Sequence, residues 1–163
     1  MPNFQIDEID RAILLTLIKD ARTPYLEIAR QRGISGAAIH QRVAKLEAAG
    51  IITGSRLQVK PSAIGLNVCA FVSIIVSDPS KCNEVVSALK GIPEIVECHY
   101  VTGDSTMLLK LYCIDNDHLM EVMLNNILKI PYIQGTNTMI SLQEAFERQV
   151  WVKDFKSTNF SKT

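Results

Sequence analysis

The sequence predicts an α+β fold, with an N-terminal winged helix-turn-helix domain and a C-terminal ferredoxin-like domain whose elements follow the order βαββαβ. Apolar residues recur at helical spacing through the first fifty residues, with short breaks between the segments. From about residue 66 onward, β-prone runs alternate with amphipathic ones. At 163 residues, 47% of them apolar, the chain is long enough for two small packed domains.

Four consecutive parts are expected. They are the winged helix-turn-helix domain at 1–59, a hinge at 60–65, the ferredoxin-like domain at 66–142 and a C-terminal tail at 143–163. The hinge prediction rests on Pro61 and Gly65, which interrupt regular structure where the charge balance changes sign. Residues 1–60 carry nine Lys or Arg against six acids, whereas the rest of the chain carries eight against eleven.

Two helices are predicted before residue 33. Asp7 is a suitable N-cap for the first helix, which runs to about Asp20 and carries an apolar stripe. Thr23 can cap the second helix, Tyr25–Arg32, and Pro24 can occupy its first position. The stripe of the first helix consists of Ile9, Ile13, Leu14, Leu17 and Ile18.

A tight turn and a third helix follow. Gly33 suits a positive φ, and Ser35 can cap a helix that stops at Gly50, which together give the spacing of a helix-turn-helix. The β-prone run Ile51–Val59 contains a glycine and predicts a small wing beside the helices. The inward stripe of the third helix is Ala38, Ile39, Val43 and Leu46.

The second domain is predicted to hold four strands and two helices. The strands are Leu66–Val76, Ile95–Thr102, Met107–Ile114 and Ile133–Leu142, and the helices run from Asp78 to Leu89 and from Asn116 to Leu128. In this order both helices cover one face of the sheet and leave the other face free, which favours contact with a partner subunit. The tail is more polar and is expected to form partial helix or strand before a loose end, with Trp151 and Phe155 as candidate anchors.

Catalytic chemistry is not indicated. The histidines His40, His99 and His118 fall in separate predicted elements, without the spacing of metal ligands or of a catalytic set. His99 lies beside Cys98 and near Glu97 in the sequence. Because neighbours along a strand point to opposite faces, Cys98 should face away from the other two, and the three residues do not form a catalytic set. The sequence therefore predicts neither an enzyme nor a metal site.

The sequence contains no run of 18 apolar residues, which is the length needed to cross a bilayer. Its first residues also lack the basic and then apolar order of a secretory signal. We therefore expect a cytoplasmic protein without a membrane partner. The four cysteines lack Cys-x-x-Cys spacing and are expected to be free structural thiols, with a disulfide as the minority alternative. They are Cys69, Cys82, Cys98 and Cys113.

Short motifs along nearly the whole chain match one known family in order and spacing. They are Asp7, Asp10, Ile13-Leu14, Ile34-Ser35, Arg42-Val43, Leu46-Glu47, Gly50-Ile51-Ile52 and Val101-Thr102-Gly103-Asp104. In these residues the chain resembles the Lrp/AsnC family, the leucine-responsive and asparagine-responsive regulators. The resemblance implies a DNA-binding winged helix-turn-helix and a ligand-regulated ferredoxin-like domain of the RAM or ACT-like type. It also implies assembly as dimers and octamers, and no cofactor beyond an amino-acid effector.

If the third helix enters the major groove, the residues near its N-terminus face the bases and basic residues contact phosphates. Gln41 can pair bidentately with adenine and His40 can donate to a purine, whereas Gly36 and Ala37, after the cap Ser35, offer only close approach and methyl contacts. The candidate phosphate contacts are Arg32, Arg42, Lys45 and Arg56.

An alternative exists for this basic segment. Residues 21–60 carry seven Lys or Arg against Glu27 and Glu47, which indicates a polyanion-binding surface or simply a solvated positive face. Arg42 in particular could pair with Glu47 or another acid instead of a phosphate. Because few groups read bases, several recognition helices are expected to act together on curved or repeated sites.

The loop Thr102–Thr106 joins two predicted strands and combines backbone amides, hydroxyls and a carboxylate, a set suited to the charged ends of an amino acid. From the residues alone, an ordinary hairpin turn is the alternative. The resemblance implies that this loop forms an effector site with the segment 132–137 of a neighbouring dimer. An aspartate is frequent in the family at position 106 and an aromatic at 105, so attraction for an ammonium group should be weaker here. The candidate effector residues are Thr102, Gly103, Asp104, Ser105, Thr106, Gln134, Gly135 and Thr136.

The expected function is that of a sequence-preferring transcriptional regulator that binds double-stranded DNA and copies of itself. A small effector, expected to be an amino acid, would modulate its assembly and its DNA binding. An architectural DNA-organising protein without an effector is the first alternative. A scaffold whose basic patch meets an acidic protein is the second.

Overall fold

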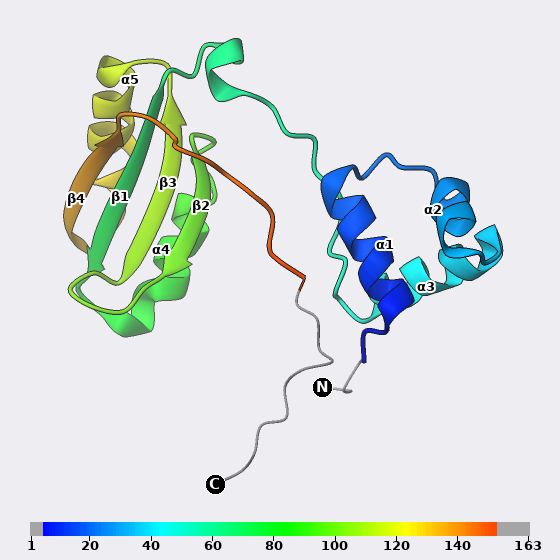
Figure 1. Cartoon of the computed structure of the whole chain (residues 1–163). Helices are drawn as coiled ribbons and strands as arrows, with labels where there is room; N and C mark the ends of the chain where they lie inside the picture. Colours follow the sequence, from blue (N-terminus) through cyan, green and yellow to red (C-terminus); the bar gives the residue numbers. More distant parts are fainter. Residues whose placement is uncertain (1–4, 153–163) are drawn as a thin grey trace, which may run out of the picture. The chain divides into compact units, whose positions relative to one another are not determined.

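The structure is a computed structural model that describes residues 5–152 of the chain. These residues divide into two compact units. The first contains residues 5–57 together with 147–152, and the second contains residues 58–146 (Figure 1).

The first unit is built from three helices, as predicted. They are α1 (Glu8–Lys19), α2 (Tyr25–Arg32) and α3 (Gly36–Ala48). Gly33 adopts a left-handed φ of 65° and ends α2, and the Ser35 hydroxyl accepts a hydrogen bond from the Ala38 amide at 3.2 Å, which confirms it as the cap of α3. Apolar stripes from all three helices meet in one small core of Ile13, Leu14, Ile28, Ala29, Ile39, Val43 and Leu46.

The start of α2 differs from the prediction. Thr23 does not cap the helix, because its hydroxyl donates to the Asp20 carbonyl at 2.8 Å. Pro24 lies just before the helix with extended backbone, and its carbonyl accepts from the amides of Glu27 and Ile28. The turn between the first two helices is therefore closed onto the end of α1, and the proline supplies the backbone geometry for entry into α2.

The expected strand pairing of the wing is also missing from the described chain. No strand lies between Ile51 and Val59. The amides of Ile51 and Ile52 instead donate to the Leu46 carbonyl at the end of α3, and residues 53–60 are exposed. β-prone residues need a neighbouring strand to satisfy their backbone groups, and this segment has none.

The second unit has the predicted βαββαβ order. Its strands are β1 (Val68–Val76), β2 (Ile95–Tyr100), β3 (Met107–Cys113) and β4 (Ile133–Ser141), and its helices are α4 (Cys82–Leu89) and α5 (Asn116–Glu121). A 3-10 turn, η2 (Pro79–Lys81), precedes α4, and a π-helical segment, η3 (Val122–Ile127), continues α5. The strands pair antiparallel in the order β2-β3-β1-β4, which confirms the ferredoxin-like fold.

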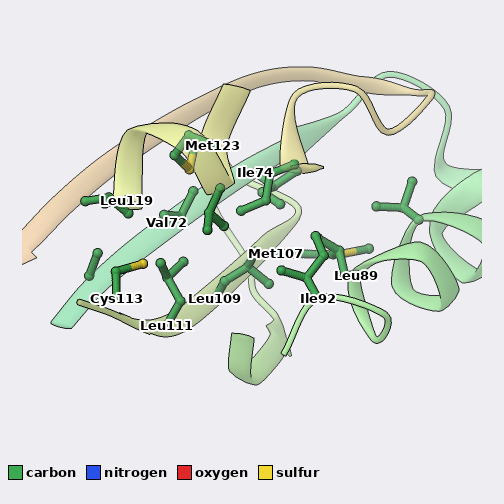
Figure 2. Packing of buried hydrophobic residues seen from close by; sticks show 14 of the residues in the cluster. Val72, Ile74, Leu89, Ile92, Met107, Leu109, Leu111, Cys113, Leu119 and Met123 are labelled. Atoms are coloured by element: carbon green, nitrogen blue, oxygen red, sulfur yellow. The ribbon is translucent and has the colours of Figure 1, made fainter. Parts of the chain in front are cut away.

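Both helices cover one face of this sheet (Figure 1). Alternate residues of β1 and β3 point toward the helices and are buried, as Val72, Ile74, Leu109 and Leu111 show in Figure 2. The residues between them face the opposite side and are less covered. One face of the sheet thus forms the core of the unit, and the other is left open.

The predicted hinge and the described part of the predicted tail contain little regular secondary structure. Residues Pro61–Ile64 form a 3-10 turn, η1, which ends at Gly65 with a φ of 86°. Residues 143–152 form neither the helix nor the strand that was expected. Trp151 is 75% exposed and does not anchor this segment, whereas Val152 packs against the core of the first unit. Phe155, the other candidate anchor, lies outside the described residues.

The four cysteines are free thiols, as expected. Cys113 is buried in the core of the second unit, where desolvation, with smaller effects of Glu94 and Asp115, raises its pKa to about 11. No helix among residues 5–152 is both long and apolar enough to span a membrane.

Candidate nucleic-acid interface and effector loop

The helix-turn-helix exposes one face of α3. Ile39, Val43 and Leu46 are buried against the other two helices, so the residues between them point outward. Ala37 and Gln41 are exposed on this outer face, and Gly36 at its start is half-buried, next to a Leu26 methyl. The predicted base-facing residues therefore lie together at the N-terminal end of one exposed helix surface.

His40 belongs to this surface but has a partner within the domain. Its ring meets the ring of Tyr25 edge-on, with the two centroids 4.7 Å apart and the planes at 71°. The contact holds the imidazole over the start of α2. Sequence reasoning did not assign a role to Tyr25, because two residues fifteen positions apart come together only through the angle between α2 and α3.

Arg42 is engaged inside the domain. Its Nη1 atom donates to Asp7 Oδ2 and to Asp10 Oδ1, both at 2.7 Å, and so ties α3 to the start of α1. Asp10 is only 5% exposed. The two carboxylates also form a capping box, in which Asp7 accepts from the Asp10 amide and Asp10 accepts from the Asp7 amide.

The structure therefore agrees with the alternative in which Arg42 pairs with an acidic residue. Its partners are Asp7 and Asp10, and not Glu47. A guanidinium that already bridges two carboxylates has one of its donor atoms committed to the protein, and the removal of the side chain would leave Asp10 buried and unpaired. We therefore assign Arg42 to helix packing. The predicted phosphate contacts remain with Arg32, Lys45 and Arg56.

Arg42, Asp7 and Asp10 form an ionic clamp, and two of its members have shifted pKa values. Burial raises the pKa of Asp7, but hydrogen bonds from the Asp10 amide and the Arg42 guanidinium outweigh it, so that the pKa is lowered below its ordinary value. The hydrogen bonds to Asp10 and then to Asp7 raise the pKa of Arg42. Asp7 and Arg42 are therefore both held in the ionic form that the pairing requires.

The other cationic candidates lie at the surface. Arg32, at the end of α2, lines a shallow depression with Glu8 and Arg11 of α1. Lys45 is exposed on α3, one turn beyond Gln41, and Arg56 is exposed in the extended segment after it. Side chains in such positions can reach a polyanion without disturbing the core.

The loop between β2 and β3 is held to the sheet by its last residue. The Thr106 amide donates to the Ile74 carbonyl at 2.8 Å, and its Oγ1 atom accepts from the Val76 amide at 3.1 Å. Thr102, Asp104 and Gly103, which has a φ of 107°, are exposed, whereas Ser105 is half-buried. Thr106 thus positions the loop, and the residues that precede it present their polar groups to solvent.

The second predicted segment lies at the same end of the sheet. Gly135 pairs with Ile75 and Thr136 pairs with Ile74 in the register of β4 against β1. Because Thr106 bonds to the same end of β1 from the other side, one chain places both segments on either side of one strand end. Gly135 and Thr136 are half-buried there, and Gln134 is exposed.

Tyr132, at the entrance to β4, has an unusual backbone. Its φ is 72°, a value that non-glycine residues seldom adopt. The conformation is held because the Tyr132 carbonyl accepts from both the amide and the hydroxyl of Ser77, at 2.9 and 3.2 Å. The Lys81 ammonium lies 5.4 Å from the centre of its ring. A fixed aromatic and a cation therefore border the sheet end that carries the predicted effector segments.

The remaining polar cluster of interest is the one around His99. His99 and Glu97 lie on the same face of β2, with 3.2 Å between Nε2 and Oε2, and Cys98 points the other way, as predicted. Glu97 also lies 3.7 Å from the Lys110 ammonium. Among residues 5–152, no group of three or more His, Cys, Asp or Glu is arranged to hold a metal ion.

An exposed, basic recognition helix on a helix-turn-helix, combined with a ferredoxin-like domain, defines a DNA-binding transcriptional regulator rather than an enzyme. The comparisons with known proteins agree. The model of a winged helix-turn-helix DNA-binding domain matches residues 6–53, and that of the Lrp/AsnC ligand binding domain matches residues 69–151. The chain belongs to the Lrp/AsnC family.

Relatives match over nearly their whole length. The regulatory protein AsnC of Escherichia coli strain K12 is 39% identical over 150 residues, which is 92% of this chain and 99% of AsnC. The solved structure of E. coli AsnC has a TM-score of 0.85 and covers 90% of this chain and 99% of its own. The transcriptional regulator FL11 of Pyrococcus furiosus is 36% identical over 138 residues, or 85% of this chain and 90% of FL11.

A further solved structure is a feast or famine regulatory protein from M. tuberculosis complexed with L-methionine. It is 28% identical, with a TM-score of 0.84, and the match covers 91% of this chain and all of that one.

Proposed function

We propose that this chain is a sequence-preferring regulator whose assembly and DNA binding respond to an amino acid. The DNA-binding part of the proposal is carried by the outer face of α3, where Ala37, His40 and Gln41 stand exposed at the N-terminal end of the helix. Gln41 is the one side chain of this set that can read adenine bidentately. Since a single helix offers so few base contacts, selectivity requires several copies on one DNA.

Affinity comes from the phosphate contacts. Arg32, Lys45 and Arg56 are exposed, and each contact with a phosphate releases counterions. Arg42 is left out of this set because its guanidinium is bound to Asp7 and Asp10. A DNA-binding protein works where the chromosome is, so we place its action in the cytoplasm.

The test of this interface is Lys45→Ala. The substitution should weaken binding to all DNA sequences alike and reduce the slope of log affinity against log salt by about one unit, because one phosphate contact is lost. The measurement is a salt titration of DNA binding by fluorescence anisotropy. Lys90→Ala, which removes one exposed cation from the second unit, is the matched control. An unchanged salt slope in Lys45→Ala would remove this residue from the interface.

The effector part of the proposal rests on the sheet end around Asp104. The exposed carboxylate of Asp104 can pair with an ammonium group, and the free amides and hydroxyls of the loop can bind a carboxylate. The family relative that was solved with L-methionine makes an amino acid the expected class of effector. Because Thr106 supplies no charge and holds the loop to β1, Asp104 carries the attraction alone among the loop residues.

Isothermal titration with the common amino acids, L-methionine first, tests this part. At least one should bind, and Asp104→Asn should weaken that binding by about tenfold or more, since a charge-assisted hydrogen bond contributes about 1.5–3 kcal/mol. Asp117→Asn, which removes one exposed carboxylate from α5, is the control. If no amino acid binds the wild-type protein, an architectural DNA-organising role replaces the sensing role.

Self-association is proposed through the open face of the sheet. Phe71, Ile75, Leu108 and Met139 lie on this face without cover from the helices. Apolar side chains that are left uncovered on the face of a sheet favour contact with a second sheet or a partner subunit. Two copies that meet face to face would form a dimer, which presents two recognition helices to DNA.

A further inference from the structure

The chain has three histidines, and His40 differs from the other two in what holds its ring. In His118 a backbone amide and a carboxylate engage the two ring nitrogens, at 3.2 and 3.3 Å, and Nε2 of His99 lies 3.2 Å from a carboxylate oxygen. The imidazole of His40 is held by the ring of Tyr25, and within residues 5–152 neither of its nitrogens has a hydrogen-bond partner. Its hydrogen-bonding groups are therefore available to a ligand.

Tyr25 is a firm support for this imidazole. It is the first residue of α2, and its half-buried side chain packs against the core of the first unit. The carbonyl of Pro24, just before it, accepts from two amides in the first turn of α2, so the backbone is held at the same point. The 4.7 Å between the ring centroids and the interplanar angle of 71° are typical of an edge-to-face aromatic pair. A side chain that belongs to the core thus holds the exposed imidazole of His40 in one orientation.

The surface of α3 one turn before His40 is open. Gly36 occupies this position, in the first turn of the helix and without a positive φ. A Cβ atom added to Gly36 would lie 3.7 Å from a Leu26 methyl, which is an ordinary van der Waals distance. The fold itself therefore does not require a glycine here, although helices disfavour this residue. Its lack of a side chain leaves room beside the imidazole, which the edge of a base can enter.

We propose that Tyr25 is a positioning residue for DNA recognition, which holds the imidazole of His40 ready to donate to a purine in the major groove. N7 of either purine accepts there, and O6 of guanine accepts as well. A neutral imidazole has one N–H donor for such an acceptor. The role of Tyr25 rests on the proposed function, because it requires α3 to enter that groove. It adds a second base-reading side chain to Gln41, together with the residue that orients it.

His40 and Gln41 should read different base pairs. Successive residues of an α-helix point about 100° apart, so two neighbours cannot face the same base edge. The contact with Tyr25 places the imidazole on the side of α3 that faces α2, and Gln41 is exposed further round the helix. The DNA site should therefore show an adenine preference that depends on Gln41 and a separate purine preference that depends on His40.

The hold on the ring matters because a free side chain must be ordered when it binds. This ordering weakens a contact by roughly 2- to 10-fold, and a ring that Tyr25 already holds avoids most of the loss. Phosphate contacts do not depend on the orientation of His40, so the effect should fall on the preference for one base and not on affinity for DNA in general. A purely structural role of Tyr25 would instead weaken binding to all DNA alike.

Selection of binding sites from a pool of random duplex DNA by the full-length protein, followed by sequencing, measures these preferences. His40→Ala should reduce the purine preference at one position about 5-fold or more and leave the adenine preference of Gln41 in place. Tyr25→Leu should reduce the same purine preference about 2-fold or more, up to the loss in His40→Ala. Tyr25→Phe should retain it, because the edge-to-face contact needs the ring and not the hydroxyl. The double variant Tyr25→Leu/His40→Ala should lose no more than His40→Ala alone.

The controls separate orientation from folding. Affinity for a duplex that lacks the selected motif, and its salt slope, should be the same in all variants, and circular dichroism verifies the fold. Gln31→Ala changes another exposed residue of α2 and should leave every preference unchanged. If Tyr25→Leu does not fold, Tyr25→Met takes its place, since it keeps an apolar side chain of similar length.

Three results would overturn the role of Tyr25. They are a purine preference that His40→Ala leaves intact, one that the folded Tyr25 variant without a ring leaves intact, and an equal loss of affinity for all DNA in that variant. A wild-type protein that selects no motif at all would contradict the proposed sequence preference itself, and the role of Tyr25 with it. The first three results leave that proposed function standing, so the two failures are distinguishable.

Discussion

The two units of this chain stabilise themselves in different ways. The first closes its core with seven buried apolar residues and an ionic clamp, in which Arg42 bridges Asp7 and the buried Asp10. The second buries fifteen residues, none of them charged. Asp10 is the one charged side chain that is buried among residues 5–152. A small helical domain has too little apolar area to fix all of its helices, so charged groups complete the packing.

The difference has a functional consequence. The first unit must keep a cationic surface for DNA, yet it uses one of its own arginines to hold α1 against α3. The second unit has no charged residue in its core, and on the open face of its sheet exposed apolar side chains such as Ile75 and Met139 lie among Glu97, His99 and Lys110. The larger apolar core lies in the second unit, and the DNA-binding unit has the smaller one.

The largest expected effect on stability comes from replacing one buried leucine in the core of each unit. Leu46 in the first unit and Leu109 in the second are both fully buried, so each change to alanine should lower the free energy of unfolding by about 2–5 kcal/mol. Because the first core is half as large, Leu46→Ala should unfold its unit and abolish DNA binding at temperatures where the second unit stays folded. Leu109→Ala should shift the transition of the second unit and leave the first in place.

Differential scanning calorimetry, together with DNA binding at each temperature, measures this contrast. Two separate transitions are expected in the wild-type protein, with the first unit melting at the lower temperature. A single transition that both variants shift equally would show that the units are stabilised together, and the comparison would fail.

The clamp gives the next largest effect. Arg42→Ala leaves Asp10 buried without its cation, so it should cost about 2–3 kcal/mol, less than a fully buried pair because the Arg42 side chain is partly exposed. Asp10→Asn lowers the charge to be compensated. In the double variant Arg42→Ala/Asp10→Asn the loss should be clearly smaller than the sum of the two single losses. Urea unfolding of the four proteins in this cycle measures the coupling, and strict additivity would exclude the clamp.

Most of the fold could be predicted from the sequence because its signals are local. Asp7, Gly33 and Ser35 mark helix ends by their own chemistry, and β-prone runs alternate with amphipathic segments in the second half of the chain. The order of elements was then enough to indicate the ferredoxin-like sheet. Two local details differ from the prediction because they depend on partners: residues 51–59 form no strand, since no neighbouring strand pairs with them, and Thr23 bonds backward to Asp20.

The candidate site was less predictable for the same reason. Arg42 has helical spacing that suits an outward cation, but its two partners lie 32 and 35 positions earlier in the chain. The stacking of His40 on Tyr25 and the anchoring of Thr106 to β1 also arise only in three dimensions. The residues that match the family include Asp7, Asp10 and Arg42, but the sequence did not show why these three occur together. In the structure they form the ion pairs that join α3 to the start of α1.

The smallest expected effect is the pH dependence of the stability that Asp7 contributes to the clamp. The pKa of Asp7 is lower in the folded chain than its ordinary value of 3.8, so the unfolded chain takes up the proton first as the pH falls. The stabilisation from this carboxylate is therefore complete above about pH 5 and is lost as the pH drops through the folded pKa. Asp7→Asn keeps a good N-cap and removes only the charge.

The wild-type protein should exceed Asp7→Asn in stability by less than about 1 kcal/mol at pH 7, because the Asp7 side chain is half exposed and solvent screens the pair. The gap should close below pH 4, which unfolding by urea at pH 7, 5 and 3.5 measures. Asp78→Asn is the matched control. The pKa of Asp78 is also lowered, by hydrogen bonds from Ser80, but this carboxylate lies in the second unit, so its replacement should leave the unfolding of the first unit unchanged. A gap that persists unchanged at pH 3.5 would mean that Asp7 acts on α1 through its shape alone, and the clamp would then rest on Asp10.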